Sequence, residues 1–314
     1  MSINNKIIVI LGPTASGKSD VAIRLAQKFD GEIISADSRQ IYRGMDIGSG
    51  KITEAEQKMA PHHMLDIASP KTEYNAAKFK KKTEKIIKDI LKRGKVPIIC
   101  GGTGFWIKAI VDNVDFPEVK PDKELRIKLQ ELSAETLFNK LKKLDPERAK
   151  NIDAKNKVRL IRAIEICKSI GKVPSISPSP SGRGVGGEGE IEFLQIGILR
   201  NKEELNERIR KNVGKRFSMG MIEEVENLHK KYKLSWKKIQ SFGLSYNLIP
   251  EFLKGNIKTK EELQEKIYLA EKNYAKRQRT WFQKDKRIIW IPIGKKEKNK
   301  YKNIEKEASE FLRK

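Results

Sequence analysis

Residues 12–19 read GPTASGKS and match the phosphate-binding pattern G-x-x-x-x-G-K-[ST]. The six residues before this stretch, KIIVIL at 6–11, are mostly apolar and predict a buried strand. Apolar residues at helical spacing after it predict a helix from Lys18 to about Phe29. Because a strand precedes the pattern and a helix follows it, we expect a P-loop, which binds a di- or triphosphate.

The residue types of the predicted P-loop suit a phosphate group. Glycines let backbone N–H groups turn toward phosphate oxygens, and the N-terminus of the following helix adds partial positive charge. Lys18 is expected to reach the outer phosphates, and the Ser19 hydroxyl is expected to bind Mg²⁺. The predicted phosphate-binding residues are Gly12, Pro13, Thr14, Ala15, Ser16, Gly17, Lys18 and Ser19. The pattern alone does not identify the reaction.

Apolar strands and amphipathic helices alternate in the first hundred residues. EIISA at 32–36 and VPIIC at 96–100 predict further buried strands, and a helix is predicted from about 74 to 93, ahead of Gly94. This alternation predicts an α/β fold, a parallel sheet with helices on both faces. Further strands are predicted at 63–67, 193–199 and 288–293.

The sequence also predicts how the chain divides. The α/β core is expected at 1–112 and 193–294, and a helical insertion domain is expected at 113–174, where apolar residues recur at helical spacing. Segment 175–192 is rich in Ser, Pro and Gly and is predicted to be a disordered loop. The Lys/Glu-rich tail at 295–314 is predicted to be a solvated helix.

Composition and charge limit the class of protein. The 314 residues include 66 lysines and arginines against 41 acidic residues, a net charge of +25. Such a charge favours a polyanionic partner such as nucleic acid, although lysines that only fill solvated helix faces are the alternative. No apolar stretch approaches the roughly 20 residues of a membrane span, and no signal peptide is recognisable, so we expect a cytoplasmic protein without a membrane partner. Two cysteines and three histidines argue against a disulfide framework or a zinc site.

Two polar stretches follow predicted strands. Asp37 comes directly after the strand at 32–36, and Thr103 lies in GGTG at 101–104. Because the carboxyl ends of the strands line the ligand crevice of an open α/β sheet, Asp37 is predicted to lie beside the P-loop. Its carboxylate could be a Mg²⁺ ligand, a general base or a helix N-cap. The glycines at 101–104 fit either close approach to a ligand or a plain turn.

Two stretches are strongly basic. Residues 142–172 contain ten lysines and arginines against four acidic residues. Residues 272–287 contain seven basic residues interleaved with Tyr274, Trp281 and Phe282. Basic side chains bind phosphates while aromatic rings stack on bases, so the second stretch predicts a surface for unpaired RNA. The alternative is a helix whose aromatic side chains face the core and whose charges are solvated.

Six motifs occur together in an order that resembles one known family. They are GPTASGKS, ISADSRQIYRGMDIGSGK, PHHMLDI, GGTGFWIKAI, NKVRLIRAIEI and YAKRQRTWF. Over most of residues 6–292 the chain is similar to tRNA dimethylallyltransferases, also called tRNA isopentenyltransferases. The resemblance implies a P-loop NTPase-like fold that binds a prenyl diphosphate where related proteins bind ATP.

The same resemblance implies a reaction. The dimethylallyl group of dimethylallyl diphosphate moves to N6 of the adenosine on the 3′ side of the anticodon, in tRNAs that read codons beginning with U. Diphosphate leaves, Mg²⁺ is the cofactor, and the enzyme is expected to be a monomer that binds the anticodon stem-loop.

The resemblance also assigns residues. Asp37 matches the family's general base, Thr103 a residue near the reacting adenine, and Arg216 an arginine that binds the diphosphate. The implied tRNA-binding residues are Asp37, Ser38, Arg39, Gln40, Thr103, Arg126, Val158, Arg159, Leu160, Ile161, Arg162, Lys276, Arg277, Gln278, Arg279 and Trp281. The chain departs from the family pattern at Gly243-Leu244-Ser245, where Gly-Tyr-Lys/Arg is usual.

Three other functions fit parts of the sequence. A P-loop kinase of a small metabolite would not need the basic aromatic segment at 272–287. Prenyl transfer to free adenine nucleotides would need neither that segment nor the helical insertion. An RNA-binding module without catalysis would not need Asp37 and Lys18 at one edge of the sheet. The sequence therefore favours prenylation of tRNA.

Overall fold

The computed structural model describes residues 5–174, 191–294 and 301–313. Among these, the residues up to Asn113 and those from 191 onward form one compact unit, and 114–174 form the second. The predicted disordered loop at 175–192 lies outside the described residues except for its last two.

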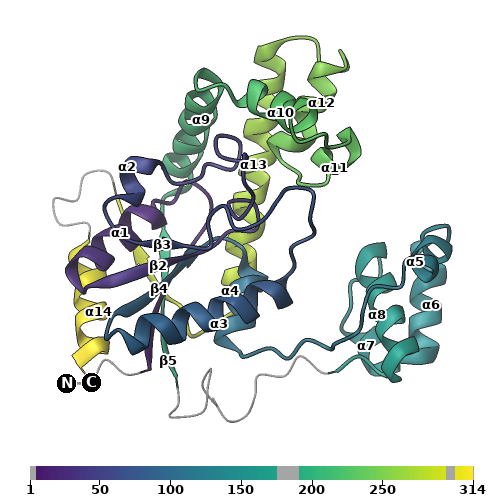
Figure 1. Ribbon diagram of the computed structural model, residues 1–314, viewed down its shortest axis with the longest axis horizontal. Helices are drawn as coiled ribbons and strands as arrows, with labels where there is room; N and C mark the ends of the chain where they lie inside the picture. The colour runs from purple at the N-terminus through teal and green to yellow at the C-terminus, as the bar shows by residue number, and fades with distance from the viewer. Residues whose placement is uncertain (1–4, 175–190, 295–300, 314) are drawn as a thin grey trace. The chain divides into compact units, whose positions relative to one another are not determined.

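The larger unit is built on a parallel sheet. Its strands in the described residues are β1 (Lys6–Leu11), β2 (Gly31–Ala36), β3 (His62–His63), β4 (Val96–Gly101), β5 (Glu192–Leu199) and β6 (Ile289–Pro292). They lie in the order β3-β2-β4-β1-β5-β6, and all neighbours are parallel (Figure 1). Strands β1 and β4 are buried throughout, which explains why their sequences are nearly continuous apolar runs.

One predicted strand is wrong in its extent. The sequence predicts a strand at 63–67, whereas β3 contains only His62 and His63. Met64 and Asp66 have φ angles of 66° and 54°. A left-handed backbone cannot continue an extended strand, so the chain turns away from the sheet at this point.

The strand register brings three loops to one edge of the sheet. Leu11 of β1 and Ala36 of β2 both pair with Gly101 of β4. Because the strands are parallel, the residues that follow them emerge side by side. The P-loop, Asp37 and Thr103 therefore share the carboxyl edge of the sheet, where α/β folds bind ligands.

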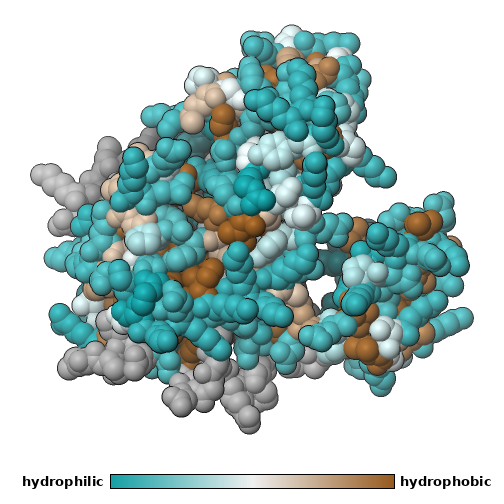
Figure 2. Space-filling model, in the orientation of Figure 1, coloured by the Kyte–Doolittle hydropathy of each residue, from teal (hydrophilic) through white to brown (hydrophobic). Residues whose placement is uncertain are grey.

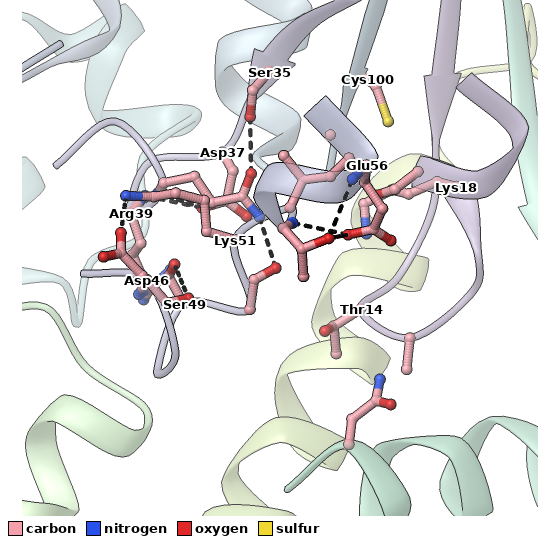
Figure 3. Close-up of a pocket in the computed structure, with 18 of the residues that line it drawn as sticks. Thr14, Lys18, Ser35, Asp37, Arg39, Asp46, Ser49, Lys51, Glu56 and Cys100 are labelled. Atoms are coloured by element: carbon pink, nitrogen blue, oxygen red, sulfur yellow. Dashed lines mark hydrogen bonds and ion pairs between the residues drawn. The ribbon is translucent and has the colours of Figure 1, made fainter. Parts of the chain in front are cut away.

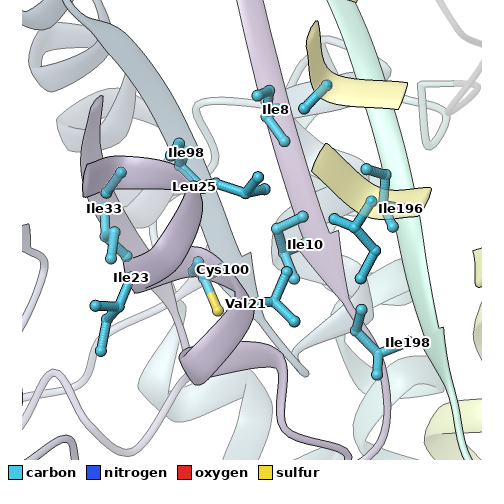
Figure 4. Packing of buried hydrophobic residues seen from close by; sticks show 14 of the residues in the cluster. Ile8, Ile10, Val21, Ile23, Leu25, Ile33, Ile98, Cys100, Ile196 and Ile198 are labelled. Atoms are coloured by element: carbon cyan, nitrogen blue, oxygen red, sulfur yellow. The ribbon is translucent and has the colours of Figure 1, made fainter. Parts of the chain in front are cut away.

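Helices α1 (Lys18–Lys28) and α14 (Lys302–Arg313) cover one face of the sheet. Val21 and Leu25 of α1 pack in the same apolar cluster as Ile10 of β1 (Figure 4). Apolar residues four apart on α1 point in the same direction, which is why a regular helix can bury this side.

The helix at the end of the chain differs from the predicted solvated helix. Ile304 and Ala308 of α14 are fully buried in the same cluster. Glu305, which lies between them, forms ion pairs with Arg24 and Lys28 of α1. A helix can be rich in Lys and Glu and still be amphipathic, because a few apolar residues at a spacing of four are enough to form one buried face.

The opposite face of the sheet is also covered, since Ile7 and Val9 point to it and are fully buried. Helices α3 (Ala76–Lys92) and α4 (Gly104–Val111) contact β4 and lie on that side in Figure 1. The other helices of this unit are α2 (Glu54–Gln57), α9 (Lys202–Ser218), α10 (Met221–Lys230), α11 (Trp236–Gln240), α12 (Ser245–Leu253) and α13 (Lys260–Phe282). No helix in the described part of the chain is long and apolar enough to cross a membrane.

The smaller unit is helical. Its helices are α5 (Lys123–Gln130), α6 (Ala134–Leu144), α7 (Pro146–Lys150) and α8 (Lys157–Ile170). Each begins after a side chain that accepts a hydrogen bond from the first turn: Asp122, Ser133, Asp145 and Asn156. Such N-caps define where the helices start, and buried leucines and isoleucines of α5, α6 and α8 form the core.

Candidate active site

A cavity of about 370 Å³ opens at the carboxyl edge of the sheet. Its wall is formed by the P-loop, the turn after β2, the segment 46–53, and parts of α9 and α13 (Figure 3). Lys18, Ser19, Asp37 and Arg216 all line it. The structure thus brings together residues that lie up to two hundred positions apart in the sequence.

Two arginines hold the backbone of the P-loop. Ala15 and Gly17 have positive φ angles of 60° and 92°, which make the tight turn ahead of α1. Arg208 Nε donates to the Ala15 carbonyl (2.8 Å), and Arg200 Nε donates to the Ser16 carbonyl (2.6 Å). These bonds fix the loop before any ligand binds. Neither arginine was recognisable from the sequence, because both contacts join residues more than 180 positions apart.

Gln278 of α13 joins the P-loop to the turn after β4. The Thr14 N–H donates to Gln278 Oε1 (2.8 Å), and Gln278 Nε2 donates to the Gly102 carbonyl (2.9 Å). A Cβ atom at Gly102 would lie 2.2 Å from Gln278 Nε2, so a larger residue there would displace this amide. The resemblance implies a tRNA contact for Gln278, which lines the cavity, is mostly buried and is hydrogen-bonded within the protein. Its two hydrogen bonds connect the P-loop to the turn after β4.

Asp37 and Thr103 lie next to each other. Asp37 Oδ1 accepts from the N–H groups of Arg39 (2.9 Å) and Gln40 (3.4 Å). The Thr103 hydroxyl oxygen accepts from the Ser38 N–H (3.1 Å). Residues 38–40 form a turn and not a helix, so the alternative that Asp37 caps a helix does not hold. The carboxylate is oriented by backbone N–H groups at the edge of the cavity.

Ser19 and Cys100 lie at the cavity wall near Lys18. Burial raises the pKa of the Cys100 thiol to about 11, so the thiol stays protonated near pH 7 and is a poor nucleophile.

Ser19 and the carboxylates of Asp20 and Asp37 line the same cavity. Oxygen atoms of this kind are the ligands that Mg²⁺ prefers, together with phosphate oxygens.

Arg216 is held in the cavity wall by an ion pair. Its Nη2 atom donates to both carboxylate oxygens of Glu271 at 2.6 and 2.7 Å, and its Nη1 atom donates to the Gly48 carbonyl (3.1 Å). Side-chain exposure is 12% for Arg216 and 5% for Glu271. A guanidinium that is mostly buried and bonded to both Glu271 and the Gly48 carbonyl has little conformational freedom, so its position in the cavity wall is fixed.

Glu224 of α10 anchors the segment 46–48, and the sequence analysis did not identify it. Its carboxylate accepts from the N–H groups of Asp46 (2.7 Å), Ile47 (2.6 Å) and Gly48 (2.9 Å). The Tyr246 hydroxyl donates to the same carboxylate (2.9 Å). No local sequence signal marks this contact, which joins residues about 178 positions apart.

Lys51 provides a second anchor for this segment. Its Nζ atom lies 2.5 Å from Asp46 Oδ1 and 2.5 Å from Asp66 Oδ1, and it donates to the Tyr42 carbonyl (3.0 Å). The Lys51 side chain is only 3% exposed. A buried ammonium with three oxygen partners is satisfied within the protein, so its role is to shape the cavity wall.

The ring of Tyr274 on α13 contacts two guanidinium groups. The ring centroid is 5.6 Å from Arg39 and 5.7 Å from Arg277. Burial raises the pKa of Tyr274, and the negative charge of Asp37 adds to the effect. These cation–π contacts connect the turn after β2 to the basic helix.

The last turns of α13 are exposed and basic. Lys276, Arg277 and Arg279 are exposed and form no ion pair among the described residues. Trp281 is 38% exposed, and its ring lies against Gly104, whereas Phe282 is buried. Trp281 is therefore partly accessible at the surface, whereas Phe282 belongs to the core. Hydrophilic side chains dominate the visible face of the molecule in Figure 2.

The residues of the smaller unit that are predicted to bind tRNA differ in their exposure. Arg159 and Val158 are exposed. Leu160 and Ile161 are buried in the core of this unit, so the prediction that they contact tRNA is not supported for their side chains. Two consecutive positions point outward and the next two inward because a helix turns about 100° per residue.

Arg126 and Arg162 meet at a buried carboxylate in the smaller unit. Glu165 accepts from Arg126 Nε and Nη2, both at 2.9 Å, and it forms an ion pair with Arg162. The Asp122 N–H also donates to Glu165 (2.7 Å). Burial raises the pKa of Glu165, but the hydrogen bonds and charges outweigh it, so the net pKa is lowered. Glu165 therefore stays ionised and fixes both arginines.

Comparisons with known proteins agree on one family. Residues 40–285 match the family model described as IPP transferase. A tRNA dimethylallyltransferase of Thermoanaerobacter sp. (strain X514) is 41% identical over 306 residues, which cover 96% of this chain and 94% of that protein.

Solved structures show the same similarity. The full-length tRNA isopentenylpyrophosphate transferase of Bacillus halodurans superposes with a TM-score of 0.72 at 31% identity, covering 99% of this chain and 97% of that one. A eukaryotic dimethylallyltransferase described as acting on tRNA superposes with a TM-score of 0.76 at 25% identity, covering 92% of this chain and 74% of that one.

Proposed function

Because this chain belongs to the IPP transferase family, we propose that it transfers a dimethylallyl group from dimethylallyl diphosphate to N6 of the adenosine 3′-adjacent to the anticodon. It is a tRNA prenyltransferase, as its relatives are. The observation that carries the finer proposal is that Lys18, Asp37 and Arg216 line one cavity. The tRNAs that read codons beginning with U are the proposed acceptors.

The donor's diphosphate is proposed to bind at the P-loop. Backbone N–H groups at the start of α1 and the Lys18 ammonium attract its oxygens. Arg216, held by Glu271, is proposed to add a positive charge in the wall of the same cavity. These charges act most strongly on the diphosphate as it departs, which lowers the barrier for breaking the C1–O bond.

Proton removal is proposed to fall to Asp37. The exocyclic amine of adenosine forms a bond to C1 of the allyl group, the C1–O bond to diphosphate breaks, and the amine must lose a proton. Asp37 Oδ1 is already bonded to two backbone N–H groups, which orients the carboxylate. Thr103, beside it, is proposed to contact the reacting adenine.

A divalent cation fits the oxygen donors of this cavity. Ser19 is proposed to hold Mg²⁺, because its hydroxyl lies in the cavity wall near the carboxylates of Asp20 and Asp37. Bound there, Mg²⁺ would neutralise charge on the diphosphate.

Nucleoside analysis tests the proposed function directly. Transfer RNA from a host with the gene should contain N6-dimethylallyladenosine or its further modified forms, and tRNA from a host without the gene should lack them. The purified chain should make the same product from dimethylallyl diphosphate and an unmodified tRNA. Purified protein that instead transfers the γ-phosphate of ATP would favour the metabolite kinase.

The exposed end of α13 is proposed to bind the anticodon arm through phosphates. If Arg277 and Arg279 each contact a phosphate, then each Arg→Ala substitution should reduce the slope of log affinity against log salt by roughly one. Donor affinity should stay unchanged. Measuring tRNA affinity at several salt concentrations checks this prediction.

The exposed Lys88 of α3 offers a matched control. Lys88→Ala should leave both affinity and salt slope at the wild-type values. Wild-type slopes in Arg277→Ala and Arg279→Ala would show that this basic face is only solvated.

Glu224 is proposed to position the segment 46–48 around the donor. Glu224→Ala leaves three backbone N–H groups without their acceptor, so unfolding free energy should fall by roughly 1–3 kcal/mol. The KM for the donor should rise several-fold, because the segment lines the cavity. Chemical denaturation and steady-state kinetics measure both effects.

Tyr246→Phe is the control for Glu224→Ala. It removes one hydroxyl bond to the same carboxylate but leaves the three backbone bonds. The KM for the donor should stay close to wild type. Equal kinetic effects in the two variants would contradict the assignment.

A further inference from the structure

Leu244 has a backbone conformation that favours glycine. Its φ and ψ angles are 51° and −130°, and Gly243 before it has a φ of 73°. Leu244 angles of this kind belong to the first central position of a type II′ turn, where glycine dominates because a Cβ atom is strained there. Strained residues cluster at functional sites, where the surrounding structure holds them in place.

Leu244 lines the same cavity as Lys18 and Asp37, and it is half-buried. Glycine would relieve the backbone strain but would remove this side chain from the cavity wall. The presence of leucine therefore points to a use for the side chain itself.

The segment around Leu244 is fastened at both ends. The Phe242 carbonyl accepts from Arg39 Nε (2.7 Å), and Arg39 belongs to the turn that starts at Asp37. On the other side, the Ser245 hydroxyl donates to the Gly48 carbonyl (3.4 Å), which also accepts from Arg216. The residue before the Gly243-Leu244 pair, Phe242, is thus tied to the turn that carries Asp37, and the residue after it, Ser245, is tied to the Gly48 carbonyl that also binds Arg216.

The cavity wall combines charged and apolar residues, and Leu244 is one of the apolar ones. Much of its wall is charged, through Lys18, Asp37, Arg208 and Arg216. The dimethylallyl group is a hydrocarbon without hydrogen-bonding atoms. A water molecule that reaches its C1 atom competes with the amine of the acceptor.

We propose that Leu244 is a specificity-determining residue that shields the allyl group, so that the amine of tRNA receives it and water does not. This inference rests on the proposed function. In the side reaction, the oxygen of water bonds to C1, the C1–O bond to diphosphate breaks, and diphosphate leaves with the electron pair. The water's proton passes to Asp37 or to solvent, and the product is the allylic alcohol 3-methylbut-2-en-1-ol.

Two substitutions separate the side chain from the backbone. Leu244→Gly removes the side chain and relieves the strain, whereas Leu244→Ala removes most of the side chain and keeps the strain. With the full chain, Mg²⁺, dimethylallyl diphosphate and an unmodified tRNA, the ratio of alcohol released to tRNA prenylated should rise by about tenfold or more in both variants. Thermal midpoints should be higher for Leu244→Gly than for Leu244→Ala.

Leu248→Ala is the matched control. Leu248 lies one turn further along α12 and does not line the cavity. Its alcohol-to-transfer ratio should equal that of the wild type. A wild-type ratio in both Leu244 variants, or an equal rise in Leu248→Ala, overturns the inference while tRNA prenylation by the wild type stands. A wild-type chain that transfers nothing to tRNA overturns the proposed function, and the inference with it.

Discussion

Asp37→Asn should slow single-turnover prenyl transfer by about 10²- to 10⁴-fold and leave tRNA affinity nearly unchanged. The physical reason is that asparagine cannot accept the proton that the adenosine amine loses. Its side-chain oxygen can still accept from the N–H groups of Arg39 and Gln40, so the turn should keep its shape. Rapid-quench measurement with saturating tRNA and donor isolates the chemical step from binding.

The same variant needs two controls. Its thermal midpoint should match that of the wild type, which separates lost chemistry from lost folding. Asp89→Asn, which changes a 64% exposed carboxylate on α3, should retain the full rate. An Asp37→Asn enzyme with near-normal single turnover would show that another group takes the proton.

Lys18→Ala should lower kcat by about 10²-fold or more and also raise the KM for the donor. The ammonium is proposed to contact a diphosphate whose negative charge increases in the transition state, so its loss should affect the reaction more than ground-state binding. In the free protein, Lys18 Nζ donates to the Pro13 carbonyl (3.3 Å), a contact that keeps it near the P-loop. Steady-state kinetics with the donor varied at saturating tRNA separates the two parameters.

Binding of tRNA provides the control for Lys18→Ala. Its affinity should not change, because Lys18 is not among the proposed tRNA contacts, which lie at residues 37–40, at Thr103, on α13 and on the smaller unit. Lys18→Arg keeps the charge and should recover part of kcat. A Lys18→Ala enzyme that loses tRNA affinity but keeps its donor kinetics would contradict a donor site at the P-loop.

The positions of the anchoring residues explain why the cavity is preformed. Arg200, Arg208 and Gln278 fix the P-loop, and Glu224 fixes the segment 46–48. Groups that are already oriented need no reorganisation when charge develops, which makes their electrostatic effect larger. Most of the framework of the site therefore consists of residues that do not react.

The sequence by itself determined the P-loop, the parallel α/β sheet and the family. These signals are local: GPTASGKS occupies eight consecutive positions, and the central strands are short apolar runs. Parallel strands buried on both faces admit few polar residues, so β1 and β4 are recognisable without neighbours. The position of Asp37 at the carboxyl edge follows from the same rule, because it is the first residue after β2.

Only the tertiary structure decided which residues support the site. Gln278 bonds to Thr14 across 264 positions, and Arg216 meets Glu271 across 55. Such contacts depend on how helices pack against the sheet, which no short pattern encodes. The same reason explains why Leu160 and Ile161 proved to be core residues: the direction in which a helical side chain points is set by the neighbours that its helix packs against.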